Sequence, residues 1–211
     1  MYAAKVKRIL DILERMYPDA ECALVHRNNY ELIVAVALSA QTTDKSVNKI
    51  TPELFKAYPT AEALAKADVN NVMDMIRTIG MYKVKSKNII ALANKLQNDY
   101  GGNVPSSYEE LESLPGVGRK TANVVRAVGF NIPSLAVDTH VFRTGKRIGF
   151  SNGNTVDKVE RDLMKIIPKK RWIRAHHSLI FHGRNLCTAR NPKCNLCDIM
   201  KYCEYTEKSI K

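Results

Sequence analysis

A lysine and an aspartate eighteen positions apart are the residues best placed by type to do chemistry. Lys120 follows a Gly-rich turn, and Asp138 precedes a run with the character of a helix start. A neutral lysine amine is a nucleophile that can form a Schiff base, and a nearby carboxylate can stabilise positive charge or move protons. The pair therefore indicates covalent amine catalysis. The simpler alternatives are a phosphate contact for Lys120 and a helix cap for Asp138.

The turn before Lys120 has the sequence LPGVGRK at residues 114–120. Pro115 ends the preceding helix, and Gly116 and Gly118 permit a tight turn that lets the backbone approach another surface. A new helix should begin at Arg119, and the unpaired N–H groups of such a helix start can hold a phosphate. The segment therefore predicts contact with a phosphate backbone.

Four cysteines lie close together near the C-terminus, at Cys187, Cys194, Cys197 and Cys203. They offer four thiolates within a short loop, and on chemical grounds either zinc or an iron–sulfur cluster could accept them. Their crowding does not resemble the disulfide framework of a secreted protein. Cys22 stands apart and is expected to be a small buried residue.

The segment LPGVGRKTA, the run Val137-Asp138-Thr139-His140 and the four-cysteine spacing together resemble the endonuclease III family of DNA glycosylases, over almost the whole chain. The resemblance implies that Lys120 attacks the sugar C1′ of a damaged nucleotide and that Asp138 assists. The four cysteines would hold a structural [4Fe–4S] cluster. We therefore expect a base-excision-repair enzyme with glycosylase and AP-lyase activities. Its substrate would be duplex DNA with oxidised or ring-saturated pyrimidines or abasic sites.

The resemblance also implies a set of DNA contacts. Such an enzyme must extrude the target base, and Gln41 matches the side chain that fills the gap. Met81 occupies a second loop that would push on the opposite strand. His140 is expected to be a structural or phosphate contact rather than a catalyst. The remaining candidate DNA contacts are Gly116, Gly118, Arg119, Arg184, Arg190 and Lys193.

The charge of the chain favours a polyanionic partner. Its 211 residues carry a net charge of +12, of which residues 133–211 contribute +9 through 16 basic and 7 acidic side chains. Such a surplus favours nucleic acid. No apolar run approaches the ~20 residues that cross a bilayer, and no signal peptide is evident. We therefore expect a cytoplasmic, nucleoid-associated protein without membrane association, and a monomer suits this chemistry.

The periodicity of apolar residues predicts an all-α fold, without convincing alternating strands. The expected helices are 6–17, 30–40, 86–100 and 172–185, with others starting at Thr51-Pro52, Asp68, Ser107, Arg119, Asp138 and Asn154. The family resemblance implies two lobes: a six-helix domain at 22–132 that contains the helix-hairpin-helix, and an iron–sulfur domain made of 1–21 and 133–211. In that arrangement Lys120 and Asp138 would face each other across a cleft.

Two other functions stay open from the sequence. One is a monofunctional relative such as an adenine glycosylase, which Lys120 and the lack of an added C-terminal recognition domain oppose. The other is a non-catalytic DNA-binding module that uses the hairpin and the cluster only for positioning. Covalent trapping of the protein on DNA would distinguish all three.

Overall fold

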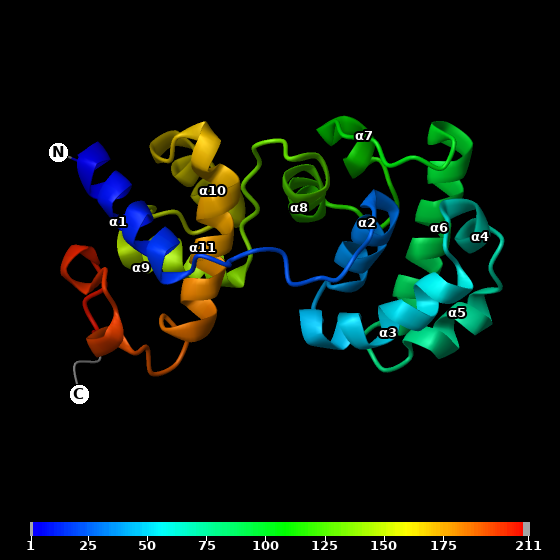
Figure 1. Cartoon of the computed structure of the whole chain (residues 1–211), viewed down its shortest axis with the longest axis horizontal. Coiled ribbons are helices and arrows are strands. Elements are labelled where there is room, and N and C mark those ends of the chain that lie inside the picture. The colour runs from blue at the N-terminus through cyan, green and yellow to red at the C-terminus, as the bar shows by residue number, and fades with distance from the viewer. Residues whose placement is uncertain (1, 209–211) are drawn as a thin grey trace. The chain divides into compact units, whose positions relative to one another are not determined.

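The computed structural model describes residues 2–208, in which every regular element is a helix and no β-strand occurs (Figure 1). The all-α prediction is confirmed. The α-helices are α1 (Tyr2–Met16), α2 (Asn29–Leu38), α3 (Asp44–Ala57), α4 (Ala61–Ala65), α5 (Val69–Ile76), α6 (Tyr82–Tyr100), α7 (Tyr108–Glu112), α8 (Arg119–Phe130), α9 (Thr139–Ile148), α10 (Val156–Ile166) and α11 (Trp172–Asn185). Short 3₁₀ turns lie at Lys169–Arg171, Cys194–Leu196 and Met200–Tyr202.

The chain divides into two compact units. The hairpin unit comprises Cys22–Ile132, and the cysteine unit comprises the first 21 residues together with those from Pro133 onward. Each unit has its own apolar core. None of the described helices combines the length and the apolar character needed to cross a membrane.

Helix α2 lies at the centre of the hairpin unit. Every residue from Tyr30 to Leu38 is buried, as its apolar character on all sides predicts, and α2 packs against α3, α6 and α8. The one charged residue among them, Glu31, receives hydrogen bonds from the Arg27 guanidinium and the Arg27 N–H. A buried charge needs such partners, so Arg27 fixes the entrance of the central helix.

The cysteine unit is built around α11, which packs against α1 and α9. Its core includes Val6, Leu13, Val141 and Leu179, all almost fully buried. At the surface, Arg171 joins α1 through ion pairs with Asp11 (2.8 Å) and Glu14 (2.8 Å). The N-terminal helix is therefore an integral part of a unit whose other elements all follow residue 132.

Several predicted helix starts are confirmed by their hydrogen bonds. Asp68 accepts from the N–H groups of Asn70 and Asn71 at the start of α5. At the start of α7 the Glu110 N–H donates to Oγ of Ser107, which is one of the two bonds of a capping box, and the Ser107 hydroxyl donates to the Glu110 carboxylate. Side-chain capping thus explains where these helices begin.

The prediction that a helix starts at Thr51-Pro52 is wrong. Helix α3 begins at Asp44 with Thr43 as its cap, and Pro52 lies inside it. Proline costs the helix a hydrogen bond at this position, but α3 buries Val47 and Leu54 completely. The burial of this apolar face outweighs the local cost.

Candidate functional site

The predicted hairpin is formed by α7, the turn at residues 113–118, and α8. Gly116 has a φ of +78°, and a Cβ atom at this position would lie 3.2 Å from Cβ of Asn88. The Val117 N–H donates to the Leu114 carbonyl at 3.1 Å and closes the turn. Glycine is therefore required at residue 116 for both its φ and its close packing.

Helix α8 starts at Arg119, and the preceding cap residue, Gly118, has an extended backbone and provides no side-chain cap. The first N–H groups of the helix are then oriented for an acceptor from outside, and an anionic oxygen is the preferred one. Gly118 has open space around its Cα, with no heavy atom within 4 Å of a built Cβ. These features suit the approach of a phosphate group.

The two hairpin helices are braced against each other by aromatic and polar contacts. The Arg126 guanidinium lies 4.0 Å from the centre of the Tyr108 ring and donates to the Ser106 carbonyl at 2.7 Å. The Tyr108 hydroxyl donates to the side-chain oxygen of buried Asn123. The start of α7 is thereby fixed to the middle of α8, which limits movement of the turn between them.

Lys120 is the second residue of α8 and is exposed to solvent. Its neighbours Ala122 and Val125 are buried and anchor the helix. The Lys120 side chain is thus accessible to a bound substrate.

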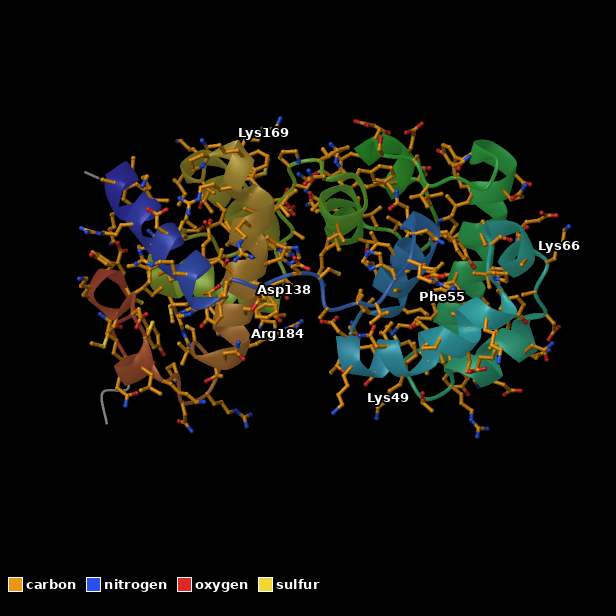
Figure 2. The ribbon with its side chains drawn as sticks, viewed as in Figure 1. Lys49, Phe55, Lys66, Asp138, Lys169 and Arg184 are labelled. Atoms are coloured by element: carbon orange, nitrogen blue, oxygen red, sulfur yellow. The ribbon has the colours of Figure 1, made fainter. Side chains whose placement is uncertain are left out.

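Asp138 caps α9 in the cysteine unit, as predicted. Its Oδ1 accepts a hydrogen bond from the Val141 N–H at 2.8 Å, and its side chain is half-buried. The preceding Leu135, Ala136 and Val137 are buried in the same unit. Figure 2 labels Asp138 near the start of α9, together with Arg184 at the end of α11.

His140 is half-buried in the first turn of α9 and is close enough to Asp138 and Arg184 for both charges to act on it. Burial lowers the pKa of His140, and the positive charges of Arg143 and Arg184 lower this pKa further, while Asp138 opposes the shift. The lowered pKa favours the neutral form of the ring. Its Nδ1 lies 3.2 Å from an Arg143 nitrogen, and this guanidinium also donates to the Gly183 carbonyl at 2.9 Å. These contacts fit the positioning role expected of His140 rather than catalysis.

The residue predicted to fill the gap left by the base, Gln41, and the residue predicted to push on the opposite strand, Met81, are here called the wedge residues. Both lie in loops of the hairpin unit. Gln41 belongs to residues 39–43, here called the Gln41 loop, and Met81 to residues 77–81, the Met81 loop. Both side chains are exposed, Met81 by 50%. Both residues also have left-handed backbones, with φ of +54° and +57°. Such conformations are uncommon for residues other than glycine and cluster at functional sites.

The four C-terminal cysteines line one pocket in the cysteine unit. Ile148, Leu186 and Met200 supply apolar walls to the same pocket. All four thiols are half-buried and none forms a disulfide. Among the described residues, no three His, Cys, Asp or Glu side chains are placed to hold a single metal ion. The four cysteines nevertheless line the same largely apolar pocket.

Arg147 organises this loop, and the sequence analysis did not identify it. Its guanidinium donates to the Thr188 carbonyl at 2.7 Å and the Ala189 carbonyl at 3.1 Å, and it lies 3.6 Å from Sγ of Cys187. The Arg147 carbonyl accepts from the Cys203 thiol at 3.2 Å. These contacts join residues that are 40 or more positions apart, so no local pattern could reveal them.

The predicted site residues divide between the two units. The hairpin unit contains Gln41, Met81, Gly116, Gly118, Arg119 and Lys120. The cysteine unit contains Asp138, His140, Arg184, Arg190, Lys193 and the four cysteines. Arg184, Arg190 and Lys193 are exposed, as phosphate contacts must be.

Comparison with known proteins gives consistent matches. Residues 34–169 match the model of the HhH-GPD superfamily base excision DNA repair protein. The chain is 46% identical to endonuclease III of Rickettsia felis over 210 residues, covering 100% of this chain and 99% of that protein. It is also 46% identical to endonuclease III of Bacillus subtilis over 208 residues, covering 98% of this chain and 95% of that protein.

A solved structure of a trapped endonuclease III–DNA covalent intermediate has a TM-score of 0.92 and 46% identity, covering 96% of each chain. A thermostable thymine-DNA glycosylase follows with a TM-score of 0.87 and 26% identity, covering 98% of each chain. With the hairpin, the four-cysteine pocket and near-complete coverage in agreement, this chain belongs to the endonuclease III family within the HhH-GPD superfamily of base excision DNA repair proteins.

Proposed function

We propose that this protein removes oxidised or ring-saturated pyrimidines from duplex DNA and then cuts the strand at the resulting abasic site. It is a bifunctional DNA glycosylase and AP lyase. The observation that carries the proposal is Lys120, exposed in the first turn of the second hairpin helix. Damaged pyrimidines that have lost planarity stack poorly, so their extrusion from the helix costs less.

The proposed reaction begins with attack of the neutral Lys120 amine on the sugar C1′. The bond from C1′ to the base breaks, and the base leaves with the bonding electrons and takes up a proton. Opening of the sugar ring and loss of the amine proton give a Schiff base between Nζ and C1′. The iminium form acidifies the C2′ proton, and its removal expels the 3′ phosphate by β-elimination. Asp138 would stabilise the positive charge that develops as the base leaves.

Borohydride trapping tests this function. Incubation with a duplex containing one ring-saturated pyrimidine should release the base and cut the strand, and borohydride should reduce the Schiff base to a stable protein–DNA adduct. A monofunctional glycosylase would release the base without an adduct. A DNA-binding module would do neither, and that result would refute the proposed function.

We further propose that Cys187, Cys194, Cys197 and Cys203 hold a [4Fe–4S] cluster. The fit rests on the donor set: four thiols that line one pocket with apolar walls, which is the usual ligand set of such a cluster. The cluster would stabilise the cysteine unit, and no step of the reaction depends on it. Arg147 would fix the loop through its contacts to residues 187–189.

Metal content is the first prediction. Protein purified without oxygen should contain about four iron atoms and four sulfides per chain and be brown. Cys197→Ser should lower the thermal stability of the cysteine unit more than it lowers the rate of AP-site cleavage. Stoichiometric zinc without iron would contradict the proposal, and zinc is the alternative that four cysteines leave open.

The second prediction concerns the exposed basic residues of the cysteine unit. Each neutralised phosphate releases counterions, so Kd for duplex DNA should rise steeply with salt. Arg190→Gln or Lys193→Gln should each reduce the slope of log K against log salt by about one and weaken binding to damaged and undamaged duplexes alike. Salt-insensitive binding would show that this basic surface does not contact DNA.

We place the activity in the cytoplasm at the nucleoid, where duplex DNA is found. The proposed protein is a monomer, since one chain carries both the hairpin and the cysteine loop. Analytical ultracentrifugation with and without DNA would measure this stoichiometry directly.

A further inference from the structure

Lys85 is a buried lysine that the proposed reaction does not use. It lies in the first turn of α6 and is only 5% exposed. Lysine is almost never buried this deeply unless it is paired. The described residues nevertheless place no carboxylate within ion-pair distance of its ammonium group. Burying the ammonium group costs free energy, so we expect it to make a contact that an apolar side chain of similar length, such as methionine, could not make.

The ammonium group of Lys85 contacts the Gln41 loop. Its Nζ donates a hydrogen bond of 2.6 Å to Oγ1 of Thr42, a residue 43 positions earlier in the chain. The Thr42 hydroxyl in turn donates to the Ala40 carbonyl at 3.4 Å. This chain of hydrogen bonds spans Gln41, because Ala40 and Thr42 are its two neighbours.

The backbone of Lys85 contacts the Met81 loop. Its N–H donates to the Met81 carbonyl at 3.0 Å, and the Val84 N–H donates to the same carbonyl. One residue is therefore bonded through its side chain to one wedge loop and through its backbone to the other. Both loops present an exposed side chain from a left-handed residue, and a conformation of this kind persists only where its surroundings hold it.

We propose that Lys85 is a positioning residue that couples the Gln41 loop to the Met81 loop, so that both exposed side chains enter the duplex together. The inference rests on the proposed function, because it assigns to Lys85 the positioning of Gln41 and Met81 relative to each other during base extrusion. Burial lowers the pKa of Lys85, but the hydrogen bonds of the two loops carry the argument. Lys85 acts through Gln41 and Met81 and is not expected to touch the reacting atoms.

Two substitutions remove the contact from opposite sides. Lys85→Met keeps the length of the side chain and removes the donor, and Thr42→Val keeps the shape and removes the acceptor. Lys95→Met is the matched control, because it removes the same charge from the same helix. The Lys95 side chain is 34% exposed and is not the one that contacts Thr42. Circular dichroism establishes that each variant is folded. If Lys85→Met fails to fold, Thr42→Val still tests the same contact.

The measurements separate base extrusion from the chemistry that follows. Each coupling variant should slow single-turnover release of a damaged base from an intact duplex by roughly 10- to 100-fold, the scale of a small misplacement. Cleavage of a preformed abasic site, where no base must be unstacked, should change by at most about threefold. The double variant should be no slower than the slower single variant, since both remove one interaction. Lys95→Met should resemble the wild type on both substrates.

A fluorescent readout follows the duplex without any chemistry. In a non-cleavable duplex with 2-aminopurine opposite the lesion, the wild type should raise emission on binding, and Lys85→Met and Thr42→Val should reduce that rise. Equal losses on intact and abasic duplexes, additive single effects, or an unchanged fluorescence rise would each overturn the inference. A wild type that unstacks 2-aminopurine but never forms a borohydride adduct would instead refute the proposed lyase function alone.

Discussion

Lys120→Gln should abolish base release, strand cleavage and borohydride trapping together. All three pass through attack of the Lys120 amine on C1′, and the amide that replaces it has no lone pair available for such an attack. The substitution lies at an exposed position in the first helical turn, and glutamine has nearly the helix propensity of lysine. The melting temperature should therefore stay close to that of the wild type, and single-turnover rates are the measurement that separates chemistry from product release.

Binding supplies the control for this variant. One charge among many carries only part of the phosphate attraction, so Lys120→Gln should retain most of its affinity for a non-cleavable damaged duplex. A Lys120→Gln protein that still forms the trapped adduct at the normal rate would show that another amine is the nucleophile.

Asp138→Asn should slow base release by two or more orders of magnitude, a loss typical of removing electrostatic stabilisation at a reacting centre. The asparagine oxygen can still accept the hydrogen bond that Asp138 Oδ1 takes from the Val141 N–H, since asparagine is as good a cap as aspartate. The variant thus loses the charge and keeps the helix start. Single-turnover base release and thermal denaturation, measured side by side, distinguish these two consequences.

Asp138→Ala is the comparison that isolates the capping role. It removes both charge and acceptor and should lower the free energy of unfolding by about 1 kcal/mol relative to Asp138→Asn. Equal rates for Asp138→Asn and the wild type would mean that Asp138 serves only as a cap. Weakened binding in place of slowed chemistry would indicate a contact with DNA instead.

The sequence predicted those features that depend on local interactions. The caps at Asp68, Ser107 and Asp138 each join atoms within a few residues. The apolar composition of α2 alone was enough to predict that this helix lies in a core. The positive φ of Gly116 is local to the hairpin turn as well, although its close packing against Asn88 is not. Each of these follows from backbone geometry and the distribution of apolar residues along a short segment.

Long-range contacts explain what the sequence did not show. Lys83, Lys85 and Lys87 alternate along the chain, a pattern that is compatible with contacts to a DNA backbone or with solvated side chains. On α6, however, Lys85 precedes Ile89 by one helical turn and shares its buried face. That spacing was available in the sequence, but the partner Thr42 was not. Arg147 is similar, because its role depends on a loop 40 residues later.

The ion pairs of α1 have a consequence for synthesis. During translation α1 leaves the ribosome more than a hundred residues before α11, against which it packs in the complete unit. Lys5 of α1 pairs with Glu204 at 2.7 Å, and Glu204 is synthesised 199 residues later. The continuous Cys22–Ile132 segment can meanwhile fold by itself, since domains generally fold as units during synthesis. Completion of the cysteine unit is thus a late event, and a nascent chain that has emerged only as far as residue 132 should carry a folded hairpin unit and an N-terminal helix still without its partners.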